Sequence, residues 1–295
     1  MQLLYPENFT DYSLLDCGDF LKLERFGPVI TIRPEPQALW KPAMTLQQWR
    51  AKAHTEFVSR SASSGEWKKL KAIPEAWVMD YKPKGSEKGF RMRLALTAFK
   101  HVGIFPEQAS NWDYIYSAVK ELQQEGIAQA RVLNLFAYTG GASLAARLAG
   151  ADVTHLDSVR QVVSWARDNM ELSALTDIRW LIEDAMTYVQ REVKRGKKYH
   201  GIILDPPAYG HGTDGKKWKL EEMIGQMMEQ VKLLLDEKSF LVLNTYSLGY
   251  SAMVAENLMK ELWKGKTSIE FGELYLKSES EMNLPLGVFG RGKNY

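Results

Sequence analysis

The feature that most constrains the fold is an alternation of short apolar segments with amphipathic ones, from about residue 111 to the end of the chain. Such alternation is typical of a parallel sheet covered by helices. Two further strand-like segments close the chain without a convincing helix between them. We therefore predict an α/β, Rossmann-like, seven-stranded sheet that ends in an antiparallel hairpin. The expected strands are 131–135, 152–156, 178–182, 200–204, 239–244, 269–276 and 286–290, and the expected helices are 111–125, 143–149, 159–170, 185–194, 220–235 and 252–263.

The first 85 residues have a different rhythm, with short apolar runs broken by turn residues. Residues 29–33 indicate a strand that two prolines end, and Asp16–Asp19 indicate a turn between two strands. Thr45 is expected to cap a helix that runs to about Val58. We predict a small β-rich N-terminal domain over residues 1–85 and a Rossmann-like domain over residues 86–295.

Charge and cysteine content exclude several classes of protein. The chain of 295 residues has a formal net charge of +2 and a single cysteine, Cys17, so neither an intrachain disulfide nor a thiolate metal cluster is possible. No apolar run approaches the roughly 20 residues of a transmembrane helix, and the N-terminus has no secretory signal pattern. We expect a cytoplasmic protein without a metal or membrane partner; the sequence leaves the oligomeric state open.

Positive charge is concentrated in one segment. Residues 66–100 contain nine Lys or Arg and four acidic residues, a local net charge of +5. A basic surface of this kind can attract a phosphate backbone, and it can equally be a solvated face of the protein. The sequence alone leaves both interpretations open.

Polar residues follow three of the predicted strands, where an open α/β sheet places its ligand. The first strand leads into a turn containing Gly140 and Gly141, which lacks the GxGxxG spacing of a pyrophosphate loop. Asp157 ends the second strand, where a carboxylate can accept the hydroxyl hydrogen bonds of a ribose. Asp184 follows the third and is suited to an adenine amine. The structural alternative is a tight turn for the glycines and a helix cap for each acid.

The most specific motif follows the fourth strand and reads Asp205-Pro206-Pro207-Ala208-Tyr209. The two prolines fix the backbone beyond the strand, so the turn can present acceptor groups beside an aromatic ring. A planar base could stack on Tyr209 while the acceptors hold its amino group or ring nitrogen. The alternative is a rigid structural loop.

Together these motifs resemble the class I S-adenosylmethionine-dependent methyltransferases, and more narrowly the branch that contains the bacterial 23S rRNA large-subunit methyltransferases I and K. The segment His101–Gln108 supports the resemblance, which covers about residues 90–260. The N-terminal part looks like the small β domain of that branch. The RNA-binding PUA domain of the rRNA methyltransferase I type has no visible counterpart in this sequence. The resemblance implies S-adenosylmethionine as cofactor and ribosomal RNA as partner. The implied cofactor-binding residues are Phe105, Glu107, Gln108, Asn134, Phe136, Tyr138, Thr139, Gly140, Asp157, Ser158, Asp184, Ala185 and Asp205.

The same resemblance implies that Asp205, Pro206 and Pro207 stand between the sulfonium and the acceptor, with Tyr209 and Asn244 completing the catalytic set. In one point the sequence departs from the cytosine C5 enzymes of the branch. Those enzymes carry a cysteine after the fifth strand, because carbon methylation needs a covalent thiolate adduct. Here residues 243–247 read Leu-Asn-Thr-Tyr-Ser. We therefore predict transfer to a ring or exocyclic nitrogen of an rRNA base.

Three other functions remain open at this point. The acceptor could be a protein side-chain nitrogen or a small molecule, which the near-neutral net charge favours. A nicotinamide-dependent oxidoreductase would fit the glycine turn and Asp157, but it fits neither the missing GxGxxG nor the Asp-Pro-Pro segment. A non-catalytic binding module would have little use for acidic residues at three strand ends.

Overall fold

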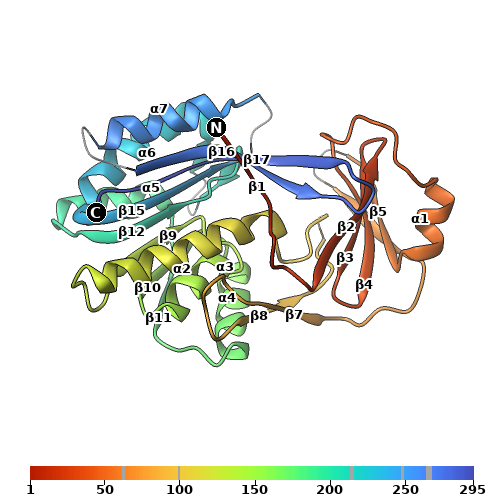
Figure 1. Ribbon diagram of the computed structural model, residues 1–295, viewed down its shortest axis with the longest axis horizontal. Helices are drawn as coiled ribbons and strands as arrows, with labels where there is room; N and C mark the ends of the chain where they lie inside the picture. The colour runs from red at the N-terminus through yellow and green to blue at the C-terminus, as the bar shows by residue number, and fades with distance from the viewer. Residues whose placement is uncertain (62–63, 99, 213–215, 247–248, 264–267) are drawn as a thin grey trace.

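A computed structural model describes residues 1–61, 64–98, 100–212, 216–246, 249–263 and 268–295. Its largest element is an eight-stranded sheet in the order β1-β16-β17-β15-β12-β9-β10-β11 (Figure 1). The sheet is parallel except where β17 pairs antiparallel with β15 and β16. The predicted α/β fold with its terminal antiparallel hairpin is thus confirmed. The strands are β1 Gln2–Leu4, β9 Arg131–Leu135, β10 Asp152–Asp157, β11 Ile178–Ile182, β12 Tyr199–Leu204, β15 Leu235–Thr245, β16 Ser268–Lys277 and β17 Asn283–Lys293.

The eighth strand, β1, was not predicted, since three residues carry too little periodicity to identify a strand. It pairs parallel with β16 from the opposite end of the sequence. Tyr5, which follows it, packs on Tyr275 with ring centroids 5.2 Å apart. The N-terminus therefore extends the large sheet.

Helices cover both faces of this sheet because both faces are apolar. Val132 of β9 packs into the core beneath α2 and α3, and its neighbour Leu133 packs into the core beneath α5 and α6. Side chains of successive strand residues point to opposite faces, so both cores draw on the same strands. The helices are α2 Ala109–Gln124, α3 Gly141–Leu148, α4 Arg160–Leu172, α5 Ala185–Lys194, α6 Leu220–Leu234 and α7 Ala252–Leu262.

The N-terminal part contains a separate five-stranded sheet in the order β2-β3-β4-β5-β6 (Figure 1, right). Its elements are β2 Tyr12–Gly18, β3 Leu21–Phe26, β4 Val29–Pro34, α1 Leu46–Lys52, β5 Thr55–Ser59 and β6 Gly65–Lys69. Thr45 caps α1 in a capping box with Gln48, as predicted. The predicted helix end at Val58 was wrong, because residues 55–59 pair with both β4 and β6 as strand β5.

A hairpin of β7 (Trp77–Tyr81) and β8 (Phe90–Leu94) connects the two parts. It packs against α4, where the backbone N–H of Arg93 donates to Asn169 Oδ1 at 2.8 Å. The proposed domain boundary at residue 85 falls in the turn of this hairpin, and β1 lies in the large sheet. The division at residue 85 remains a proposal.

Two short elements, a 3-10 turn and a small hairpin, lie near the end of β12. A 3-10 turn, η1 (Pro106–Gln108), leads directly into α2, so Asn111 lies inside that helix and does not cap it as predicted. A small hairpin, β13 (Tyr209–His211) with β14 (Lys217–Lys219), follows the Asp-Pro-Pro segment. Among the described helices, none is long and apolar enough to span a bilayer.

Candidate cofactor and acceptor site

The candidate site lies where β9 and β12 are neighbours and the direction of the strand order reverses. Gly140 follows β9 with a φ of +93°, and Phe136 and Tyr138 in the same turn have φ values of 57° and 48°. Non-glycine residues seldom adopt such angles, and they gather at functional sites. The turn therefore has the strained backbone expected beside a ligand.

The second glycine of the turn, Gly141, is required for a different reason. A Cβ on Gly141 would lie 2.5 Å from the Trp112 ring. Helix α2 therefore occupies the space beside Gly141 that a side chain would need. This glycine is required by helix packing.

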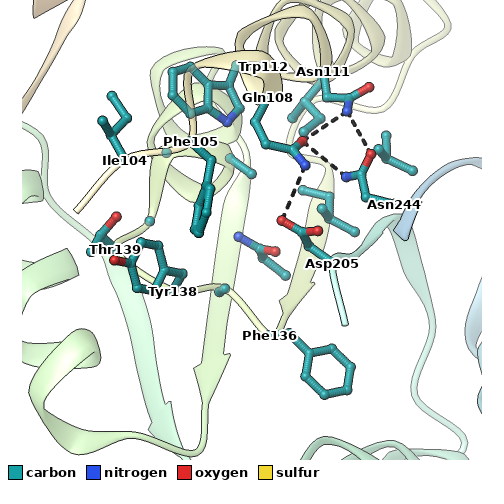
Figure 2. A pocket seen from close by; sticks show the side chains of 18 of the residues that line it. Ile104, Phe105, Gln108, Asn111, Trp112, Phe136, Tyr138, Thr139, Asp205 and Asn244 are labelled. Carbon is teal, nitrogen blue, oxygen red and sulfur yellow. Dashed lines mark hydrogen bonds between the residues drawn. The ribbon is translucent and has the colours of Figure 1, made fainter. Parts of the chain in front are cut away.

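The turn lines one side of a small inner cavity of about 40 Å³ (Figure 2). Gln108, Asn111 and Asn244 form a closed amide network in it. Asn111 Nδ2 donates to Gln108 Oε1 and to Asn244 Oδ1, both at 2.9 Å, and Asn244 Nδ2 donates to Gln108 Oε1 at 3.1 Å. The predicted residues that line this cavity are Phe105, Gln108, Asn134, Phe136, Tyr138, Thr139, Gly140, Asp205 and Asn244.

The amide network orients Gln108 toward Tyr246 and Asp205. Its Nε2 donates to the Tyr246 hydroxyl at 2.7 Å and, more weakly, to Asp205 Oδ2 at 3.4 Å. Burial raises the pKa of the neighbouring Glu107 carboxyl group, while Lys22 and the Tyr246 hydroxyl act against this rise. Asn244, predicted as catalytic, acts here as a partner of Gln108, whereas Tyr246, which no local motif indicates, faces the acidic groups directly.

Asp205 is an acid with a strongly raised pKa. Burial, followed by repulsion from Glu107, raises its pKa from 3.8 to about 7. Its Oδ1 is buried and has no hydrogen-bond partner among the residues that the structure describes. A buried acceptor without a donor is costly, and such atoms mark places where a ligand completes the bonding.

A larger cleft of about 830 Å³ opens outside the inner cavity. Three groups of residues form its walls. The predicted cofactor residues Phe105, Glu107, Phe136, Tyr138, Asp157 and Ser158 line it, as do Asp205, Pro206 and Pro207. The third group comes from the N-terminal sheet and from the segment before η1, and it was not predicted: Lys22, Arg33, Glu35, Lys100 and His101.

Asp157 stands at the end of β10 as expected. Its carboxylate accepts the backbone N–H groups of Tyr138 at 3.0 Å and of Val159 at 2.9 Å, one on each oxygen. Burial outweighs these bonds and raises its pKa. The carboxylate is thus fixed at the cleft, and each oxygen retains a lone pair for a ribose hydroxyl.

Asn134 and Thr139 are buried, and both use their side chains within the protein. Asn134 Nδ2 donates to Ser143 Oγ at 2.9 Å, and Thr139 Oγ1 donates to the carbonyl of Gly103 at 2.7 Å. Ser143 also bonds His155 Nδ1 at 3.0 Å, and burial lowers the pKa of His155 to about 3, so this histidine is neutral. These contacts hold the turn in shape.

Three of the predicted positions lie outside the two cavities. Asp184 caps α5, since its Oδ1 accepts the backbone N–H of Thr187 at 2.9 Å, which is the structural alternative for this residue. Gly212, beyond β13, lies against the same carboxylate. Tyr209 is half exposed in β13. Neither Asp184, Ala185 nor Tyr209 lines the two cavities formed by the described residues.

Cys17 lines neither of these two cavities. It lies in β2 with no solvent exposure, and burial raises its pKa to about 11. A neutral, enclosed thiol of this kind cannot act as a nucleophile.

Comparison with known proteins gives a consistent result. A family model described as S-adenosylmethionine-dependent methyltransferase matches residues 33–265. The fold is also similar to a crystal structure of the SAM-dependent methyltransferase from Agrobacterium tumefaciens. The TM-score is 0.90 at 35% sequence identity, over 100% of this chain and 94% of that chain.

Two curated relatives are named ribosomal RNA large subunit methyltransferase K/L. The relative from Alteromonas mediterranea is 24% identical over 279 residues, which are 88% of this chain and 37% of the relative. The relative from Pseudoalteromonas atlantica is 32% identical over 127 residues, which are 42% of this chain and 16% of the relative. The chain thus spans only a minor part of the length of these relatives.

Proposed function

The chain belongs to the S-adenosylmethionine-dependent methyltransferase family, and on that premise we propose that it methylates a ring or exocyclic nitrogen of a base in ribosomal RNA. S-adenosylmethionine supplies an electrophilic methyl group when bound. The residues present fit this cofactor, because Asp157 is a fixed acceptor for a ribose and Phe105 and Tyr138 give the cleft an aromatic wall, with ring centroids 5.3 Å apart. Asp184 and Ala185 as adenine-binding residues remain a prediction.

The observation that carries the nitrogen acceptor is the unpartnered Oδ1 of Asp205. An acceptor nitrogen that bears a hydrogen can donate it to this atom, which fills the missing bond and aligns the nitrogen lone pair for attack. With a pKa of about 7, Asp205 is also matched to accept that proton at neutral pH. Pro206 and Pro207 leave no backbone N–H beside it to compete for the carboxylate.

A carbon acceptor lacks such support. Methylation of cytosine C5 needs a thiolate adduct, and the single cysteine of the sequence is the buried, neutral Cys17. The stretch that ends β15 presents Asn244 and Tyr246 instead. Both take part in the hydrogen-bond network around Gln108, so they position groups and do not attack.

Ribosomal RNA as the substrate class is supported by the names of the curated relatives and by the basic character of residues 66–100. A substrate of this kind would place the enzyme in the cytoplasm. An acceptor on RNA would have to be turned out of its stack into the cleft.

The test combines chemistry and genetics. Purified enzyme is incubated with labelled S-adenosylmethionine and with rRNA from a strain in which the gene is deleted, and the nucleosides are analysed by mass spectrometry. We expect one methylated nucleoside to be missing from the deletion strain and restored in vitro. Asp205→Ala should abolish transfer and leave cofactor affinity within about twofold, because the ribose acceptor Asp157 and the aromatic wall of Phe105 and Tyr138 are unchanged. If every methylated rRNA nucleoside persists in the deletion strain, the acceptor is a protein or a small molecule.

A further inference from the structure

The wall of the outer cleft that the N-terminal sheet and the segment before η1 contribute carries an excess of positive charge. Lys22, Arg33 and Lys100 line it, and two buried carboxylates, Glu24 and Glu35, accompany them. Arg33 donates to both oxygens of Glu24, with Nε at 2.7 Å from Oε2 and Nη2 at 2.9 Å from Oε1. Lys22 lies 3.5 Å from Glu24 and 3.3 Å from Glu35. Both carboxylates are thus used by two of the three cations.

Lys100 is the cation left over. Within the part of the chain that the structure describes, its ammonium group has no ion-pair or hydrogen-bond partner, while its backbone carbonyl accepts Arg33 Nη1 at 3.1 Å. Arg33 therefore anchors the main chain of Lys100 to the N-terminal sheet and leaves the side chain available at the cleft. An unpaired, half-buried cation is unfavourable until an anion approaches it.

The charges of this wall also act on the pKa values of Lys100 and His101. Burial lowers the pKa of Lys100; among the charges, Glu35 and Glu24 raise it, whereas Lys22 and Arg33 lower it. Burial and the three cations also lower the pKa of His101 to about 3, so this ring stays neutral at the cleft wall. An imidazole that cannot be charged can still stack or bond with a ligand, whereas the ammonium of Lys100 is positioned for a negative group.

We propose that Lys100, supported by Lys22, forms a phosphate subsite that holds the backbone of the RNA nucleotide to be methylated. This inference rests on the proposed function and names its substrate contact. The same cleft that Lys100 lines also contains Asp205, Pro206 and Pro207, so one nucleotide can reach both regions. The volume of about 830 Å³ lies high in the range of ligand pockets, roughly 300–1,000 Å³, which leaves room for an acceptor beside the cofactor.

A phosphate explains the arrangement better than the carboxylate of the cofactor. The methionine part is expected at the turn of Asn134 to Gly140, which lines the inner cavity, and neither Lys22 nor Lys100 lines that cavity. Phe105, which contacts His101 with ring centroids 5.1 Å apart, stands between the two regions and lines both cavities. The cation should therefore affect the acceptor and leave the cofactor unaffected.

The first experiment measures binding to enzyme saturated with S-adenosylhomocysteine. Calorimetry compares each of the four nucleoside 5′-monophosphates with its nucleoside. We expect at least one monophosphate to bind about tenfold tighter than its nucleoside, as a charge-assisted contact would give. Lys100→Met should remove this difference, Lys100→Arg should retain it, and the control Lys88→Met, at an exposed lysine of the same basic segment, should not change it.

The second experiment uses rRNA from the deletion strain as substrate. Lys100→Met should raise KM for this RNA about tenfold and reduce the salt dependence of binding by about one phosphate contact, with kcat and the affinity for S-adenosylhomocysteine unchanged. If rRNA is methylated and Lys100→Met retains the wild-type KM, the subsite is refuted while the proposed function stands. If rRNA is not methylated but a monophosphate binds through Lys100, the subsite stands and the RNA acceptor is refuted.

Discussion

Replacing Asp205 by asparagine tests two effects of the buried carboxyl group: its effect on the rate of methyl transfer and its effect on the free energy of unfolding. The pKa of this group is about 7 in the folded protein against an ordinary 3.8. The folded state therefore binds the proton more tightly than the unfolded state, and folding stability falls as the pH rises from about 3.8 to about 7. At about 1.36 kcal/mol per pKa unit, the full cost of ionising Asp205 is about 4 kcal/mol above pH 7.

The asparagine variant does not ionise, so it avoids this cost. Its amide nitrogen loses some stability if it finds no acceptor, about 1–3 kcal/mol, but that loss does not depend on pH. The difference in unfolding free energy between variant and wild type should therefore shift in favour of the variant by about 2–3 kcal/mol from pH 5 to pH 8. Urea unfolding at both pH values, followed by circular dichroism, measures this shift.

The activity of the wild-type enzyme should rise with pH over the range in which its stability falls. Wild-type kcat/KM should rise about tenfold per pH unit up to pH 7 and then level off, because the ionised carboxylate accepts the proton. Asp205→Asn should lose a factor of roughly 10²–10⁴ and the ionisation step with it. Asp168→Asn, at an exposed position of α4, serves as the control. A wild-type stability that shows no relative decline between pH 5 and pH 8 would refute the assignment of the raised pKa.

Three further changes test the framework around the site. Gly141→Ala should lower the free energy of unfolding by more than about 2 kcal/mol, since its Cβ would lie 2.5 Å from the Trp112 ring; chemical denaturation measures this loss. Cys17→Ser should leave kcat unchanged in a methyl-transfer assay and cost about 1–3 kcal/mol of stability for a buried hydroxyl; an inactive but folded variant would contradict the nitrogen acceptor. Glu24→Gln should cost about 3–5 kcal/mol in thermal or urea unfolding, because it leaves the buried Arg33 guanidinium without its counter-charge.

The helices and strands predicted best from the sequence are those whose residue patterns are local. Residues 131–135, 178–182 and 185–194 have the predicted bounds, because each is an apolar run or an amphipathic period ended by turn residues. The prediction was wrong where contacts with residues distant in the sequence determine the local structure. Residues 55–59 continue a helical pattern but pair with strands on either side, and Asn111 looks like a cap but is drawn into the helix by bonds to Gln108 and Asn244.

The candidate site divides in the same way. Asp157 and Asp205 each end a strand, so the regular order of a parallel sheet brings them to one edge, and a reader of the sequence can place them there. Tyr246 is linked to the site through Gln108, and Lys100 is held at the cleft because Arg33 of the N-terminal sheet binds its carbonyl. No periodicity encodes such pairings. Asp157 and Asp205 are therefore predictable from strand ends, whereas the proposed phosphate subsite depends on how the N-terminal sheet is docked. If the phosphate subsite is correct, the five-stranded sheet helps to select the substrate that enters the cleft, and the Rossmann-like sheet provides the residues for methyl transfer.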